Sequence, residues 1–196
     1  SQVDPTHPLF GRAMYRAYRG PDYYSFNAGG VHFVALNTVD IADQWYYGHV
    51  DAQQLSWLAR DLAMVPAGTP VVTFNHIPFY SVGELLGGYT DQPPAPTLIT
   101  VDGRVQFRHT VSNAREVIAA IAPHPYPLAL AGHVHFRERI SLETPGGTIR
   151  FHQSAATVGN SSAGWAVLPS GVTFYSIIDG VIDDGQFVPL EPAPRT

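Results

Sequence analysis

The chain has 196 residues, of which 45% are hydrophobic and 14% charged, and its formal net charge at pH 7 is −5. This composition predicts one domain with a sizeable core, and a mildly acidic chain without a basic run is not expected to bind nucleic acid. No apolar run reaches the ~20 residues that a membrane-spanning helix needs. The sequence has no cysteine, so any metal site must use His, Asp, Glu or Asn ligands.

Apolar spacing and turn residues predict the secondary structure. The expected elements, in chain order, are a short helix near 12–18, two strands within 23–39, a helix over 50–65, a buried strand over 70–76, a hairpin within 97–107, a helix over 111–123, a buried strand over 127–133, and strands at 138–142, 148–152, 172–178 and 186–188. Asp51 and Gln54 match a capping box, and Ser112 is expected to cap the second long helix. This order predicts α/β layers that pass into a β-rich end, with the boundary between residues 144 and 145.

Three of the nine histidines occupy similar positions in the predicted fold. His76, His133 and His135 each lie at the carboxyl end of an apolar strand, which is where ligands bind in open α/β sheets. If residues 133–135 are extended, the last two imidazoles point to one side from Cα atoms about 6–7 Å apart. That separation would let them straddle two metal ions ~3.5–4 Å apart. The alternative is that these histidines only close their strands, but three of them favour metal binding.

Two segments carry a family resemblance. "VVTFNHIPFY" and "LALAGHVHFRER" resemble the last two motifs of the calcineurin-like metallophosphoesterases, in particular the purple acid phosphatase branch and bacterial relatives with a C-terminal β domain. "GPDYYSFNAGGVHFVALNT" and "QLSWLARDLA" are similar to the preceding strand pair and helix of that family. The resemblance runs from about residue 19 to residue 140. It implies that residues 1–144 are the C-terminal part of a four-layer αββα sandwich and that residues 145–196 form a small β-rich region.

The resemblance also implies a reaction and a metal centre. The family hydrolyses phosphate esters with two ions of Fe, Mn or Zn, which polarise the phosphoryl group and activate water. By resemblance, His76 and His133 would bind the second ion and His135 the first. The substrate would be a small or macromolecular phosphoester, and the resemblance favours a periplasmic or extracellular location.

The acidic half of the family's centre is missing from this sequence. Asp-x-His, Gly-Asp with the bridging aspartate, and Gly-Asn-His with the catalytic histidine do not occur. Three neutral imidazoles cannot offset the charge of two ions or bridge them, so at most partial occupancy is expected in this chain alone. We therefore expect the N-terminal half of the domain, with the catalytic histidine, to come from another chain or a longer precursor. Without that half, apolar faces should be left uncovered.

Two other functions remain open at this point. Three histidines and a water can hold a single zinc or iron ion, which would make this a mononuclear metal protein. Alternatively, the histidines are structural and the chain is a non-catalytic β-rich binding module. Tyr80, Arg108 and His109 are candidates for contacts with a phosphate or its leaving group, although Tyr80 could instead pack and Arg108 could be solvated. Residues 81–110 separate the last two motifs and are expected to determine the substrate.

Overall fold

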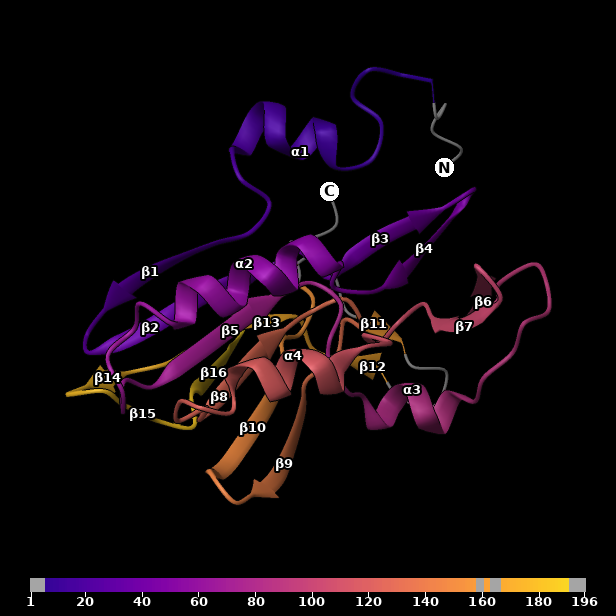
Figure 1. Ribbon diagram of the computed structural model, residues 1–196. Helices are drawn as coiled ribbons and strands as arrows, with labels where there is room; N and C mark the ends of the chain where they lie inside the picture. The colour runs from indigo at the N-terminus through magenta and orange to yellow at the C-terminus, as the bar shows by residue number, and fades with distance from the viewer. Residues whose placement is uncertain (1–5, 158–160, 163–166, 191–196) are drawn as a thin grey trace.

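The computed structural model describes residues 6–157, 161–162 and 167–190. Its centre is a six-stranded sheet with the order β1-β2-β5-β8-β10-β9 (Figure 1). The inner four strands run parallel, and each edge strand is antiparallel to its neighbour. In sheet order the strands are β1 (Tyr24–Ala28), β2 (Val31–Leu36), β5 (Val71–Asn75), β8 (Leu128–Ala131), β10 (Gly147–Gln153) and β9 (Glu138–Thr144). The predicted mixed α/β class is confirmed.

The remaining elements are helices and small hairpins. The helices are α1 (Arg12–Arg19), α2 (Ala52–Leu62), α3 (Val82–Gly87) and α4 (Ala114–Ile121). The paired strands outside the main sheet are β3 (Val39–Ala42) with β4 (Trp45–Gly48), β6 (Leu98–Val101) with β7 (Arg104–Phe107), β11 (Ser161–Ser162) with β12 (Val167–Leu168), β13 (Gly171–Phe174) with β16 (Gln186–Pro189), and β14 (Ile177–Ile178) with β15 (Val181–Ile182). Within the described residues, none of the helices is long and apolar enough to cross a bilayer.

Helices α2 and α4 pack side by side on one face of the sheet (Figure 1). Leu58 and Leu62 of α2 are buried there, as the apolar spacing predicts. They pack with Val34 and Val71, because alternate residues of a strand point to the same face. Gln54 is also fully buried, since its side-chain amide bonds both backbone groups of the residue that follows β2. These two hydrogen bonds join α2 to the carboxyl end of β2.

The two predicted helix caps have different outcomes. Asp51 accepts a hydrogen bond from the backbone N–H of Gln54 at 2.8 Å, so this cap is confirmed. The predicted Ser112 cap is wrong, because α4 begins later, with Asn113 at its N-cap position. The Ser112 hydroxyl instead accepts from the backbone N–H of Phe107. The Asn113 side chain bonds both backbone groups of Val50, so both polar side chains serve tertiary contacts.

The C-terminal strands cover part of the opposite face. Ile182 of β15 is buried against Val31, Val72 and Leu128, at the amino-terminal ends of the parallel strands. The predicted β-rich region 145–196 begins with β10, which joins the main sheet beside β8, and its later strands form the small pairs. The uncovered remainder of this face lies toward the carboxyl ends of the strands, where the predicted site is located.

One buried histidine on this face predicts how stability depends on pH. His152 is 5% exposed, and its Nδ1 lies 3.0 Å from the Tyr175 hydroxyl. Burial, followed by the positive charges of Arg139 and Arg150, lowers the pKa of His152 to about 4. Between this value and an ordinary histidine pKa near 6.5, the unfolded chain binds more protons, so stability is lost as the pH falls. We expect His152 to lower the free energy of unfolding by about 3 kcal/mol as the pH falls from 7 to 4.

Replacing His152→Asn removes the titrating group and keeps a polar atom near the Nδ1 position. The free energy of unfolding, measured in urea from pH 7 to pH 4, should fall less steeply in the variant than in the wild type. Parallel curves for the two proteins would show that this histidine does not contribute to acid sensitivity.

Candidate metal centre

His76 and His133 meet at one edge of the sheet. His76 follows β5 directly, and His133 follows β8 after one glycine. These two strands are parallel neighbours, so their carboxyl ends lie together. Nε2 of His76 is 3.2 Å from Nδ1 of His133, and the ring centroids are 5.0 Å apart. The strand-end placement therefore brings together two of the three histidines that the sequence singled out.

The third predicted ligand, His135, lies in a turn. The expectation of an extended segment is wrong, because His133 and His135 have φ angles of 73° and 62°, in the left-handed region. The chain turns at once after β8, with the Val134 N–H bonded to the carbonyl of Gly132. His135 is exposed, yet its charge lowers the pKa values of both other rings. Within the described ranges, no group of three or more His, Asp or Glu side chains is arranged to hold a metal ion.

His109 contacts the ring nitrogen of His133 that does not face His76. Its Nδ1 lies 2.8 Å from Nε2 of His133, and the two rings stack with centroids 5.0 Å apart. The Tyr46 hydroxyl is 3.4 Å from the same Nδ1 atom. His76, His133 and His109 thus form a continuous row of rings, which we call the histidine row. Sequence reasoning missed Tyr46, because nothing in its local sequence indicates that β4 brings it next to a residue 63 positions away.

The histidine row is uncharged at neutral pH. Burial, followed by the neighbouring imidazoles, lowers the pKa of His133 to about 3. Burial and the charge of His135 lower the pKa of His76, and burial and the charge of Arg108 lower that of His109. Neutral rings keep the lone pairs that metal binding requires. These rings supply nitrogen donors and no negative charge.

Two of the three predicted substrate-binding residues have packing contacts. The Arg108 side chain is buried, with its guanidinium 4.5 Å from the ring centroids of both Trp45 and Tyr46. It donates to the backbone carbonyls of Tyr46 and Pro96, so the solvated alternative is wrong. The Tyr80 ring packs 5.2 Å from that of Phe151. Their contact with a phosphate, and that of His109, remain predictions.

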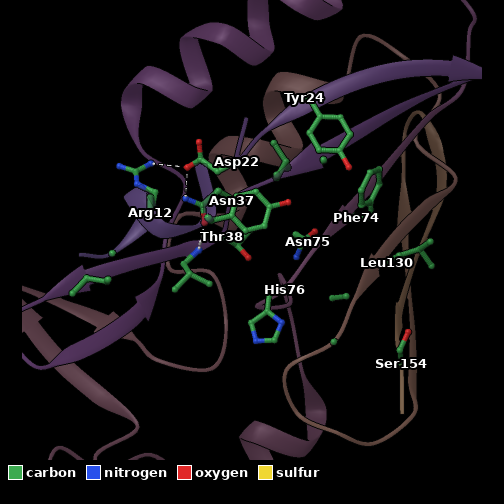
Figure 2. A pocket seen from close by; sticks show the side chains of 18 residues that line it. Arg12, Asp22, Tyr24, Asn37, Thr38, Phe74, Asn75, His76, Leu130 and Ser154 are labelled. Carbon is green, nitrogen blue, oxygen red and sulfur yellow. Dashed lines mark hydrogen bonds and ion pairs between the residues drawn. The ribbon is translucent and has the colours of Figure 1, made fainter. Parts of the chain in front are cut away.

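A cavity of about 750 Å³ opens beside His76, on the sheet face opposite α2 and α4 (Figure 2). Its apolar wall comes from the central and edge strands and includes Tyr24, Phe74 and Leu130. Its polar wall includes Arg12, Asp22, Asn37, Asn75 and Ser154. Apolar side chains of the sheet therefore line a cavity next to the histidine row.

Comparison with known proteins places part of the chain near one class of enzymes. No family model matches the chain, but a limited region is related to metallophosphoesterases. Purple acid phosphatase 15 from Arabidopsis thaliana is 46% identical over 61 residues, which cover 30% of this chain and 10% of the relative. Purple acid phosphatase 13 from the same plant is 41% identical over 63 residues, covering 31% and 10%. The match thus spans about a tenth of the length of these curated relatives.

Proposed function

We propose that this chain forms part of a phosphoester hydrolase with two metal ions, of Fe, Mn or Zn, and that it supplies the nitrogen ligands of that centre. The observation that carries the proposal is the 3.2 Å separation between Nε2 of His76 and Nδ1 of His133. Two nitrogens bound to one tetrahedral zinc ion, each about 2.0–2.1 Å from it, lie about 3.3–3.4 Å apart, close to this separation. The local similarity to purple acid phosphatases supports the same chemistry.

The donors present fit one side of such a centre. His76 and His133 would hold one ion, and His135 would reach the other. Bound ions of this kind polarise a phosphoryl group and lower the pKa of water. The absence of a three-ligand group within the described residues gives no support to the mononuclear three-histidine alternative. In the proposed centre the carboxylates, and the catalytic histidine, come from outside this sequence.

The uncovered sheet face supports a place for the missing half of the domain. Tyr24 and Phe26 are 40% and 45% exposed on the edge strand, and their rings lie 6.1 and 6.2 Å from that of Phe74. A second sheet packs about 10 Å from the first, and it would cover these rings and the cavity. Its strand ends would then lie beside His76. We infer a four-layer αββα sandwich whose second sheet is supplied by another chain or a longer precursor.

Metal titration of the 196-residue chain tests the proposal. We expect one Zn²⁺ site per chain, partly occupied, with binding lost in His76→Ala and in His133→Ala. His124→Ala is the matched control, because His124 follows α4, in the loop that leads into the amino end of β8. Stoichiometry by calorimetry and by elemental analysis should agree. Zinc binding that survives both substitutions would contradict the proposal.

A further inference from the structure

We propose that His109 is a positioning residue, which fixes the ring of His133 so that Nδ1 of His133 faces the ion site. This inference rests on the proposed function, and it starts from the two contacts of a single ring. One nitrogen of His133, Nε2, lies 2.8 Å from Nδ1 of His109. The other, Nδ1, lies 3.2 Å from His76. The hydrogen bond at Nε2 therefore decides whether Nδ1 of His133 carries a proton or a lone pair.

A neutral imidazole has one N–H donor and one lone pair, so the direction of the first bond matters. If Nε2 of His133 carries the proton, it donates to His109, and the Nδ1 lone pair points into the space that it shares with His76. If His109 donates instead, the proton of His133 moves to Nδ1 and blocks that space. Only the first arrangement prepares His133 as a ligand.

One general property of metal-binding histidines favours the first arrangement. They generally donate their other ring N–H to an acceptor, which sets the tautomer and the ring orientation. Nδ1 of His109, 2.8 Å from Nε2 of His133, is placed to accept that bond. That acceptor is usually a carboxylate, carbonyl or water, and here an imidazole nitrogen occupies its position.

The backbone around His109 is held firmly enough for this role. Val111 donates its N–H to the carbonyl of Pro78, two residues after His76, and Ser112 donates to the carbonyl of Gly48 at the end of β4. A side chain at Gly48 would lie 2.1 Å from the carbonyl oxygen of Thr110, so the two segments touch. The stacking of Arg108 on two rings of β4 adds a third attachment.

Two substitutions at position 109 distinguish the effect of the hydrogen-bond acceptor from the effect of the volume of the ring. His109→Asn keeps an oxygen near the Nδ1 position, whereas His109→Leu fills the space without an acceptor. In the metal-free chain, ¹⁵N NMR of the imidazoles should report the Nε2–H tautomer of His133 in the wild type and in His109→Asn, and a mixture in His109→Leu. The Kd for Zn²⁺, from chelator competition, should rise about 10–100-fold in His109→Leu alone.

Each outcome has a distinct meaning. A wild-type chain with the proton of His133 on Nδ1 overturns the inference, and this measurement needs no variant to fold. Equal Zn²⁺ affinity in the wild type and His109→Leu, with both lost on His133→Ala, also overturns the inference and leaves the proposed function standing. An Nε2–H tautomer that depends on residue 109 in a chain that binds no Zn²⁺ supports the positioning role and rejects the proposed function. Urea unfolding of both variants checks that they are folded.

Discussion

Extending the chain at its amino terminus with a segment that supplies the missing Asp-x-His, Gly-Asp and Gly-Asn-His motifs is expected to raise phosphoester hydrolysis at least about a thousandfold over the chain alone. Stabilisation of a phosphoryl transition state by bound ions amounts to several kcal/mol, and each 1.4 kcal/mol is about tenfold in rate. The nitrogen donors of His76, His133 and His135 cannot hold two ions without carboxylates. The measurement is hydrolysis of p-nitrophenyl phosphate with added Zn²⁺ or Mn²⁺.

The same extension should change the surface and the metal content. If its sheet covers Tyr24, Phe26 and Phe74, binding of a hydrophobic dye to this face should decrease. Metal content should rise to two ions per molecule. An extended chain that is no more active than the 196-residue chain, and still binds the dye, would refute both the second sheet and the divided metal centre.

The second large effect is expected from His133→Ala in the extended chain. Removing a residue that hydrogen-bonds to a metal ligand, without itself touching the metal, lowers affinity or activity about 10–100-fold. Removing a ligand itself should therefore lower kcat/KM more than about 100-fold. His133 contacts both His76 and His109, and its removal breaks the histidine row in the middle.

Metal content and activity should fall together in this variant, while His124→Ala keeps both. Because His133 is only partly buried, the free energy of unfolding of the metal-free protein should change little. Near-normal kcat/KM in His133→Ala would mean that the histidine row is structural.

The sequence predicted the strands of the sheet and the meeting of two histidines for a simple reason. Apolar runs such as Val71–Asn75 and Leu128–Ala131 are too short and too buried for helices, and parallel strands end at one edge. The residues that follow two neighbouring parallel strands therefore lie at the same edge of the sheet. This alone is enough to predict that His76 and His133 lie close together.

The parts that could not be predicted depend on contacts between distant segments. His109 and Tyr46 are 63 residues apart, and only the packing of β4 against the segment after β7 brings them together. The left-handed backbone of His133 and His135 was missed because positive φ is expected at glycine, and glycine lies one position earlier. Ser112 has the chemistry of a cap, but its hydroxyl is already bonded by Phe107.

The turn after β8 restricts which residues can occupy positions 133 and 135. Two residues apart on a straight strand, both imidazoles would lie on the same side of the sheet. The turn at Gly132–Val134 leaves His133 half-buried and His135 exposed. Valine or isoleucine at either histidine position would conflict with this backbone, because β-branched side chains rarely adopt positive φ.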